Sequence, residues 1–395
     1  MSSIDVLFIC NNLEETRAPY RRIGYFLKYF RSRGLKTSCI GFIHLTRHGI
    51  VKPFKGCYSV PLDISSRSLA ILPLNFLLSF SLIPLILILR PRVIIISIPD
   101  SYLVLASYIG GSLVRSKIII DIRDPQEEVK SSMYKKSLSS FIVKVYKRIN
   151  YSIYKKAQVV VGVTRTLITI MASEIHRLIH IIPNGVDLSI FKPLDKEEAR
   201  LKLGLSRESL LIGYIGGLSS YGYYDILPIL TAIRKVRREL NIDIKLVAAG
   251  SIYDESIKRI VEGFIDGFRY LGVLDTKGVI TLLSACDLGV IPRIGDPIYD
   301  YAIPVKFYEY IATGLPIIVI ARKCSELAEV VEKNKLGIVC EPQDHICLKS
   351  AITTFATNKT TLDKYKKNVL AFRGHIDRRI GAERLYKLIN KLISK

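Results

Sequence analysis

The chain has 395 residues, of which 49% are hydrophobic, and its 58 Lys and Arg exceed its 35 Asp and Glu. This length is large for a single domain, and the apolar content is ample for two packed cores. The net charge of +23 favours anionic partners such as phosphates or a membrane face, and the sequence has no motif of a nucleic-acid reader, so nucleic acid is not expected.

Short Val/Ile/Leu-rich runs alternate with helical patterns in both halves, which is typical of parallel sheets with crossover helices. The runs are continuous rather than alternating, as in strands covered on both faces. The pattern therefore predicts an α/β protein with two sheets. The predicted strands are 6–10, 36–42, 93–98, 117–123, 159–164 and 179–183 in the first half, and 211–216, 244–249, 268–273, 288–292, 316–321 and 337–340 in the second.

The first strand follows the N-terminus without a basic start or a cleavable small-residue site, so the sequence predicts no signal peptide and a cytosolic protein. The cysteines occur singly, without the short spacing of zinc or thiol redox sites, and we expect reduced, mostly buried thiols. The histidines also lack metal-site spacing and no Asp-x-Asp motif occurs, so neither a metal nor another cofactor is expected. The cysteines are Cys10, Cys39, Cys57, Cys286, Cys324, Cys340 and Cys347.

The segment Leu69–Leu89 contains no charged residue. As one helix it would be about 30 Å long, enough to cross a bilayer core. A span would separate the first two strands from the rest of their sheet, and the positive flanks, Arg67 and Arg90, assign no orientation. Two alternatives stay open: a helix buried in the soluble domain, and a helix that dips into one leaflet.

The run Asp121–Pro125 ends a predicted strand, at the edge where open α/β sheets bind ligands. Charged residues that emerge together at a strand end favour function, and an ion pair of Arg123 with Asp121 or Asp124 is the structural alternative. The following stretch, Lys130–Lys156, interleaves lysines with tyrosines, which suits anionic lipid headgroups. A solvated helix face is the alternative there.

Two runs indicate a family. Residues 181–187 read Ile-Ile-Pro-Asn-Gly-Val-Asp and divide the two series of strands, which marks a hinge. Residues 304–319 read as an amphipathic helix that presents Lys306 and Glu309, followed by a glycine turn and a buried strand. Together they resemble glycosyltransferase family 4, the retaining nucleotide-sugar transferases of the GT-B fold. The resemblance extends from about Asp5 to the C-terminal helix.

The resemblance implies two facing Rossmann-like domains with a cleft between them. Residues 1–190 would form the acceptor domain, 191–374 the nucleotide-sugar domain, and the basic helix 375–395 would cross back onto the first domain. The implied activity is transfer of a sugar from a nucleotide-diphosphate donor to a glycan or lipid-linked acceptor. The uncharged segment 69–89 and the basic stretch 130–156 predict in addition that the enzyme is held peripherally at the cytosolic face of an anionic membrane.

The resemblance also implies a donor site. Glu309 would accept hydrogen bonds from the two ribose hydroxyls, with an exposed, unliganded helix glutamate as the alternative. Gly216 and Gly217, between a strand and a helix, would let backbone N–H groups approach phosphate, although a glycine pair is often only a tight turn. Many family members place an arginine and a lysine in that loop, and this chain has neither. Lys306 is the first replacement cation and Arg293 the second, with a surface arginine as the alternative for Arg293.

Family members often carry a sugar-binding glutamate eight positions before the Glu309 equivalent, where this chain has Tyr301. Asp296 and Asp300 are nearby acids that would substitute, or they cap turns. On the first domain, Arg123 and Asp124 match an Asp-x-Arg-Asp run of similar family members, and we expect them in catalysis with Lys306 and Arg293. The loop after the first strand is the expected acceptor site. Its candidate residues are Asn11, Arg17 and Arg21, whose arginines suit a phosphate-bearing acceptor.

Two rival interpretations remain at this point. A nucleotide-sugar epimerase shares the two-domain architecture. A non-catalytic membrane or partner-binding protein on a degenerate transferase fold would explain both Tyr301 and the glycine loop without cations.

Overall fold

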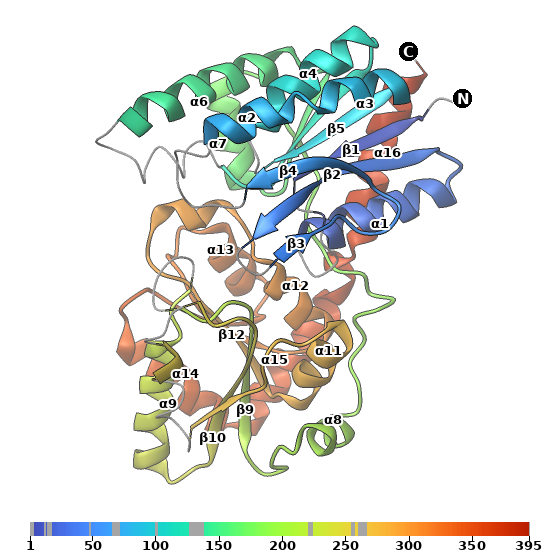
Figure 1. Ribbon diagram of the computed structural model, residues 1–395. Helices are drawn as coiled ribbons and strands as arrows, with labels where there is room; N and C mark the ends of the chain where they lie inside the picture. Colours follow the sequence, from blue (N-terminus) through green and yellow to red (C-terminus); the bar gives the residue numbers. More distant parts are fainter. Residues whose placement is uncertain are drawn as a thin grey trace. The chain divides into compact units, whose positions relative to one another are not determined.

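The computed structural model describes residues 4–11, 13, 18–46, 49–64, 72–98, 102–125, 138–219, 224–253, 257–259 and 267–394. The chain forms two compact units (Figure 1). The first comprises Met1–Asn184 and Arg378–Lys395, and the second Gly185–Asp377. Each is built on a mainly parallel sheet with helices on both faces, so the predicted α/β fold with two Rossmann-like units is confirmed.

The sheet of the first unit has the order β3-β2-β1-β5-β6-β7-β8, and β4 also pairs with β2. All the pairings are parallel except that of β2 with β3. The six predicted strands are confirmed, whereas β3 and β4 were not predicted. The strands are β1 (Val6–Ile9), β2 (Thr37–Thr46), β3 (Gly49–Val51), β4 (Tyr58–Ile64), β5 (Val93–Ile98), β6 (Lys117–Ile122), β7 (Val159–Gly162) and β8 (His180–Ile181).

Helices cover both faces of this sheet (Figure 1). On one face, α1 (Ala18–Ser32) and α16 (Arg378–Ile393) pack together and bury Phe26 and Leu385 against sheet residues such as Phe8. The final helix therefore packs in the first unit. The other described helices of this unit are α2 (Leu72–Ser79), α3 (Leu82–Leu89), α4 (Leu103–Leu113), α6 (Leu138–Lys156) and α7 (Arg165–Ile175).

The second unit has a six-stranded parallel sheet in the order β11-β10-β9-β12-β13-β14. This is the 3-2-1-4-5-6 order of a doubly wound sheet, whose strand order reverses between β9 and β12. All six predicted strands are confirmed, with small differences at their ends. They are β9 (Leu210–Ile215), β10 (Ile244–Ala249), β11 (Phe268–Tyr270), β12 (Leu288–Pro292), β13 (Ile317–Ile320) and β14 (Gly337–Cys340).

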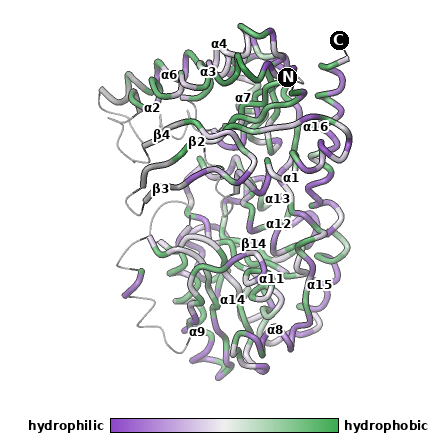
Figure 2. Tube along the Cα trace, turned by 45° about the vertical axis from the view of Figure 1, so that its right-hand side comes forward, coloured by the Kyte–Doolittle hydropathy of each residue, from purple (hydrophilic) through white to green (hydrophobic). Residues whose placement is uncertain are grey.

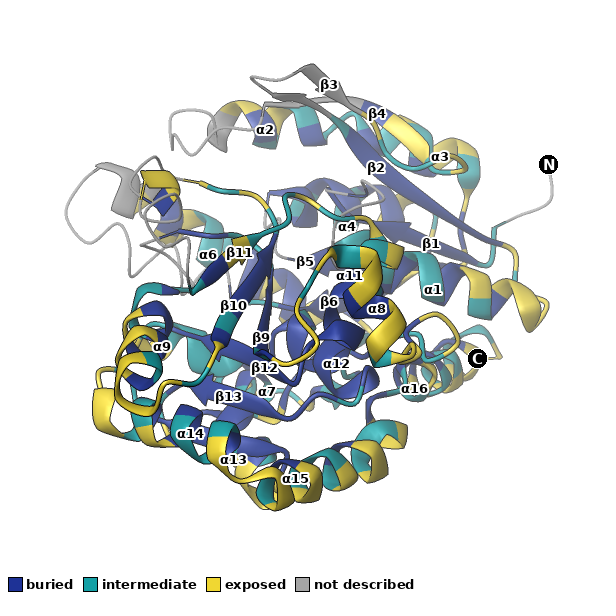
Figure 3. Ribbon diagram, turned by 90° about the horizontal axis from the view of Figure 1, so that it is seen from below, coloured by how far each residue is buried: buried dark blue, intermediate teal, exposed yellow. Residues whose placement is uncertain are grey.

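The strands of the second sheet are buried on both faces (Figure 3). One core joins Ile212 and Val290 to Ile233 of α9, and the other joins Leu211 and Ile291 to Phe307 of α12. The continuous apolar runs are thus explained by burial on two sides. The helices are α8 (Lys196–Leu203), α9 (Leu227–Leu240), α11 (Thr276–Ala285), α12 (Val305–Ala312), α13 (Glu326–Lys333), α14 (His345–Thr357) and α15 (Lys359–Phe372), with 3₁₀ helices η2 (Pro297–Tyr301) and η3 (Arg373–Ile376).

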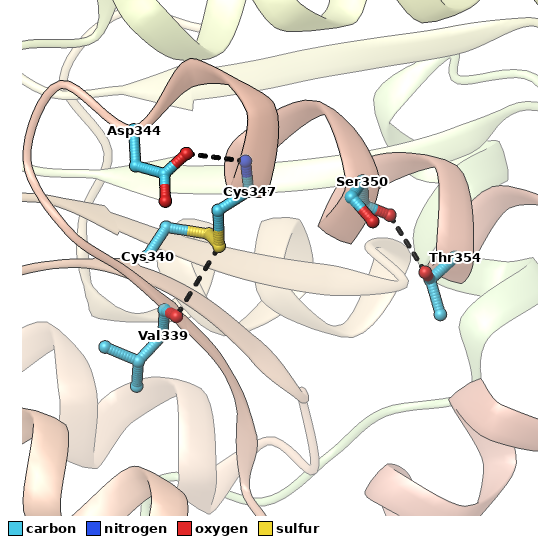
Figure 4. The surroundings of a disulfide bond; sticks show 6 residues. All are labelled: Val339, Cys340, Asp344, Cys347, Ser350 and Thr354. Atoms are coloured by element: carbon cyan, nitrogen blue, oxygen red, sulfur yellow. Dashed lines mark hydrogen bonds between the residues drawn. A yellow bond between two sulfur atoms is a disulfide. The ribbon is translucent and has the colours of Figure 1, made fainter.

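The expectation of reduced cysteines is wrong for four of the seven. Cys39 of β2 is bonded to Cys57, and Cys340 of β14 is bonded to Cys347 of α14. Figure 4 shows the second bridge, beside the capping bond from the backbone N–H of Cys347 to Asp344. The paired cysteines are 18 and 7 positions apart, so neither pair has the short spacing of a thiol redox site. The remaining cysteines form no disulfide: Cys10 and Cys286 are buried, and Cys324 is exposed.

The uncharged segment forms two helices of eight residues each, α2 and α3, which are separated at Phe80 and Ser81. Neither approaches the length of about 20 residues that a membrane span requires. Across the described residues, no helix is both long enough and apolar enough to cross a bilayer. A fully buried helix is not observed either, because Leu77 and Ile88 are 66% and 61% exposed. Leu69 lies outside the described residues.

Candidate donor site

The helix α12 is fixed to the strand ends at the point where the strand order reverses. The Tyr310 hydroxyl accepts a hydrogen bond from the backbone N–H of Ile215 at 3.1 Å and donates one to the carbonyl of Val290 at 3.2 Å. Gly289 leaves room for the Tyr310 ring, since an added Cβ would lie 2.6 Å from it. These two bonds fix the position of the residues that precede Tyr310 in the helix. Ligands of open α/β sheets bind at such reversal points.

Glu309 and Lys306 lie on the same helix, one turn apart, and both are buried, with exposed fractions of 5% and 6%. The alternative of an exposed helix glutamate is therefore wrong for Glu309. A buried carboxylate needs hydrogen-bond or ionic partners, because its desolvation is costly. A nucleoside's vicinal hydroxyls are two donors of the required kind.

The Lys306 ammonium lies between two aromatic rings. Its Nζ is 4.0 Å from the centroid of the Tyr214 ring and 3.6 Å from that of Tyr224. It is buried and has no hydrogen-bond partner among the residues that the structure describes. Burial lowers the pKa of Lys306 well below its ordinary value, and Arg293 adds to this effect while the Glu309 carboxylate opposes it.

The glycine loop lies against Lys306. Gly216 directly follows β9 and has φ +124°, a backbone conformation that L side chains rarely adopt. A Cβ built at Gly216 would lie 3.1 Å from the Lys306 Nζ, and one at Gly250 would lie 2.0 Å from the Gly216 carbonyl oxygen. The two loops after β9 and β10 thus contact each other through backbone atoms at glycine positions, where no side chain intervenes. This arrangement leaves the Lys306 side chain as the cation beside the loop.

The ring of Tyr253 occupies the space beside Gly217. A Cβ at Gly217 would lie 2.4 Å from the ring of Tyr253, which follows β10. The backbone N–H of Tyr253 donates to the carbonyl of Leu218, which holds the two loops together. A side chain at 217 therefore requires the Tyr253 ring to move. Residues 220–223 of the loop lie outside the described residues.

Arg293 is buried, so the surface-arginine alternative is wrong. Its Nη2 donates to the carbonyl of Ala302 at 2.6 Å, and its Nη1 donates to the carbonyl of Tyr299. The guanidinium therefore holds the η2 segment in place, and its buried Nε–H has no partner among the described residues.

The acids of this segment have structural partners. Asp296 caps η2, with its side chain accepting from the N–H of Ile298 at 3.0 Å. Asp300 pairs with Arg322 at 3.1 Å, and burial raises the pKa of Asp300. Tyr301 is the last residue of η2 and is half-buried. The capping alternative is thus correct for Asp296.

In the first unit, Asp121 forms its ion pair with Arg22 and not with Arg123. Its carboxylate is fully buried and accepts from Arg22 of α1, with the Arg22 Nη2 3.0 Å from the Asp121 Oδ1. Arg22 also donates to the carbonyls of Ile182 and Pro183 and to the Asn184 Oδ1 in the hinge run. This network is structural, because it ties α1, the end of β6 and the chain leaving β8 together.

Arg123 and Asp124 follow β6 directly. Arg123 is buried and its Nε donates to the carbonyl of Ile98 at 3.1 Å, whereas Asp124 is half-buried. Their catalytic roles stay predictions. The expected acceptor loop is shorter than the sequence indicated, because Arg21 lies inside α1 rather than in a loop.

The remaining acceptor candidates have these positions. Asn11 is buried after β1, and its carbonyl accepts from the N–H of Phe42 at 3.2 Å. The Arg21 carbonyl accepts from Arg378 of α16 at 2.6 Å. Arg17 lies outside the described residues. Within the described ranges, no group of three or more His, Cys, Asp or Glu could hold a metal ion.

This geometry coincides with a family match. Residues 209–358 match the model of the family described as Glycosyl transferases group 1. The match starts at β9, includes the glycine loop, Arg293 and all of α12, and ends after α14. Every proposed donor residue of the second unit therefore lies inside it.

The chain is also similar to known proteins over greater lengths. A probable glycosyltransferase, WbjE, from Pseudomonas aeruginosa is 23% identical over 235 residues, which are 58% of this chain and 56% of that protein. The curated relatives that the chain matches are thus covered over about half of their length or less. Two solved structures have the same fold, each with 13% identity and a TM-score of 0.71. They are HepE from Anabaena in complex with UDP and glucose, with 98% of this chain and 100% of HepE covered, and WaaG, a glycosyltransferase involved in lipopolysaccharide biosynthesis, with 97% and 99% covered.

Sequence reasoning missed the tyrosines around Lys306. Tyr214 lies inside an apolar strand, where it reads as core, and Tyr224 lies in a loop of no regular pattern. The signal that was available is the density of aromatic residues from Tyr214 to Tyr224, in a loop where the resembled family places cations. Arg22 was missed as a structural residue because its partner is 99 positions away.

Proposed function

We propose that this chain is a retaining glycosyltransferase that moves a sugar from a nucleotide-diphosphate donor to a glycan or lipid-linked acceptor. The observation that carries the proposal is the pair Lys306 and Glu309, which one helix buries beside the Gly216 loop at the reversal point of the second sheet. The family match over residues 209–358 and the shared fold with HepE and WaaG support it.

In this proposal, the second unit binds the donor. Glu309 accepts from the ribose hydroxyls, the Gly216 loop approaches the diphosphate with backbone N–H groups, and Lys306 supplies positive charge. The bond between the anomeric carbon and its phosphate oxygen breaks, and the electron pair leaves with the diphosphate. The acceptor oxygen bonds to the same face of that carbon, and its proton passes to the departing diphosphate. Lys306 accelerates the step by stabilising the charge that grows on the leaving group.

The first unit would bind the acceptor, with Asn11, Arg17 and Arg21 as its candidate contacts and with Arg123 and Asp124 near the reacting centre. The residue at the Tyr301 position would contact the donor sugar. The proposed reaction uses no metal or other cofactor, since the protein's cations and dipoles offset the diphosphate charge.

A donor panel tests the activity. UDP-, GDP- and ADP-sugars are incubated with the wild type and with Glu309→Ala, and nucleotide release is followed with and without lipid and glycan acceptors. We expect acceptor-dependent release with one nucleotide and its loss in the variant. Isomerised donor in the absence of acceptor would identify an epimerase instead. No binding of any of these nucleotides by calorimetry would identify a non-catalytic protein.

We further propose that the first unit holds the enzyme on the anionic, cytosolic face of a membrane. The helices α2, α3 and α6 all contact α4, and Figure 2 shows long hydrophobic stretches in this part of the unit. Several large apolar side chains there are exposed while the polar Asn75 and Ser79 are buried, which is the reverse of a soluble helix. The exposed apolar residues are Leu74, Leu77, Leu87, Ile88, Leu113, Phe141 and Val145.

Positive charge on α6 supports the choice of an anionic lipid surface. Lys144, Arg148, Lys155 and Lys156 are exposed on this helix. Each basic residue near such a surface adds about 1 kcal/mol of attraction, and apolar side chains enter the headgroup boundary. Lys147 is partly engaged, since it pairs with Glu174 at 3.8 Å. Lys130, Lys135 and Lys136 lie outside the described residues.

Liposome co-sedimentation tests this attachment. The wild type should pellet with vesicles that contain anionic lipid, and less so at high salt, because exposed charges are screened over about 10 Å at 0.1 M salt. The double variant Leu77→Ser, Ile88→Ser should pellet less. Leu201→Ser is the matched control, because Leu201 is 72% exposed on α8 of the second unit. Equal, negligible pelleting on neutral and anionic vesicles would overturn the membrane proposal.

A further inference from the structure

The Lys306 ammonium has an unusual set of neighbours. It is buried, and within the described part of the chain its nitrogen has no hydrogen-bond partner. Its neighbours come from three other segments: Tyr214 from β9, Tyr224 from the segment before α9, and Arg293 from the end of β12. Glu309 faces it from its own helix. A buried ammonium with so few polar contacts is costly, so the fold keeps it there for a reason outside stability.

The aromatic faces explain how the ammonium is tolerated. A ring face attracts a cation by about 2 kcal/mol when the pair is desolvated. The ring carries no net charge, so it holds the ammonium without repelling an arriving anion. A further carboxylate at the position of the rings, in addition to Glu309, would hold the lysine more tightly but would repel a diphosphate.

We propose that Tyr214 and Tyr224 are positioning residues that hold the Lys306 amine at the Gly216 loop, so that the donor's diphosphate becomes its principal anionic partner. The inference rests on the proposed function. An arginine and a lysine in the loop after β9 would otherwise place positive charge beside the diphosphate. In this protein one lysine from α12 and two aromatic rings have that role. The loop itself contributes Gly216, where no Cβ blocks the approach to the amine.

Proton uptake on donor binding distinguishes a Lys306 amine that is positioned for the diphosphate from one with a merely structural role. Because burial favours the neutral amine, part of the Lys306 population binds its proton only when the diphosphate arrives. Donor binding should then take up protons from solution at a pH between the pKa values of the free and the bound states. A clamp of exposed arginines would take up none, since an arginine stays charged in both states.

Calorimetry with UDP, GDP and ADP measures this uptake. The best-binding nucleotide is titrated at pH 8 in two buffers of different ionisation enthalpy, and the difference in observed heat gives the protons taken up. We expect net uptake for the wild type and none for Lys306→Met. Tyr224→Phe keeps the ring face and should behave as the wild type does. Tyr224→Leu should bind on the order of tenfold more weakly, with greater proton uptake, because the free amine is less often charged without the ring.

The control variant is Tyr365→Leu, a half-buried tyrosine of α15 whose ring contacts Phe355 and not Lys306. It should leave both affinity and proton uptake unchanged. Nucleotide binding without proton uptake, or a Tyr224→Leu variant with wild-type affinity and uptake, would overturn the positioning role and leave the proposed function standing. A folded wild type that binds none of the three nucleotides would overturn both.

Discussion

Arg22 and Asp121 form a buried ion pair in the first unit, with the Arg22 Nη2 3.0 Å from the Asp121 Oδ1 and both side chains at most 3% exposed. Arg22 also bonds the carbonyls of Ile182 and Pro183, so one guanidinium fastens α1 to the end of β6 and to the chain that leaves the unit. A network of this kind is sensitive to the loss of either member, because the other is left buried and charged.

We therefore expect Arg22→Met to destabilise the first unit by about 3–5 kcal/mol. Lys28→Met is the control, since Lys28 is exposed on the same helix. Urea unfolding of both variants, with hydrogen exchange to assign the loss to the first unit, provides the measurement. Equal stability of the two variants would show that the pair contributes nothing.

Glu309→Ala should weaken nucleotide-sugar binding by roughly 1.5–3 kcal/mol, because two ribose hydroxyls lose a charged acceptor. The control is Glu332→Ala on α13, an exposed helix glutamate. Calorimetry with the best donor of the panel measures the difference, and circular dichroism checks the fold. Unchanged affinity in a folded Glu309→Ala variant would remove this residue from the donor site.

Lys306→Met should lower the turnover rate more than donor affinity, because its charge meets the negative charge that grows on the leaving diphosphate. Arg293→Ala should act differently, since it removes the bonds that hold Tyr299 and Ala302 and so loosens the whole η2 segment. Steady-state kinetics of the two variants, with their melting temperatures, separate the effects. Intact turnover in Lys306→Met with none in a stable Arg293→Ala variant would invert the phosphate assignment.

The buried amine also predicts a dependence of stability on pH. The pKa of Lys306 is lowered in the folded state, so between that pKa and about 10.4 the unfolded chain binds more protons and stability rises with pH. Lys306→Met removes this penalty, so it should stabilise the second unit more at neutral pH than at higher pH, relative to the wild type. The gain should shrink at pH 10. Unfolding measured at both pH values tests the sign, and a gain that grows with pH would contradict it.

The disulfides predict a dependence on reductant. In the chain-entropy model, the bridge of Cys39 and Cys57, which closes 18 residues, contributes about 3 kcal/mol, and that of Cys340 and Cys347, which closes 7, somewhat less. Cys57→Ser and Cys347→Ser should each lower the melting temperature, and dithiothreitol should then have less effect on each variant than on the wild type. A melting temperature of the wild type that is indifferent to reductant would show that the bridges do not form in solution.

The two sheets could be predicted from the sequence because a central strand that is buried on both faces is a continuous run of apolar residues. The strands β3 and β4 give no such signal, since they lie at the edge of the first sheet, where neighbouring strands impose less on the composition. The helix that carries Glu309 and Lys306 could be predicted because the spacing of its apolar and charged residues and the glycine turn after it are local features of the sequence.

The rest of the site depends on contacts that no local pattern records. Tyr214 and Tyr224 reach Lys306 from segments more than 80 positions earlier in the chain. Asp121 appears beside Arg123 in the sequence, yet the fold pairs it with Arg22. The bridge of Cys39 and Cys57 follows from the register of β2 and β4, and that of Cys340 and Cys347 joins β14 to the helix after it. Long-range partners of charged and sulfur-bearing side chains are thus what the sequence alone left open.

The contact between Gly217 and Tyr253 also constrains how this protein can change. Adding a Cβ at Gly217 brings it to 2.4 Å from the Tyr253 ring, so an arginine there is incompatible with the present position of the ring. A side chain at 217 therefore requires the Tyr253 ring to turn aside, and because Tyr253 is 52% exposed the ring can turn toward solvent. An arginine at 217 would place a second cation in this loop, beside Lys306. Directed evolution toward an arginine at 217 should therefore favour variants with a smaller residue at 253.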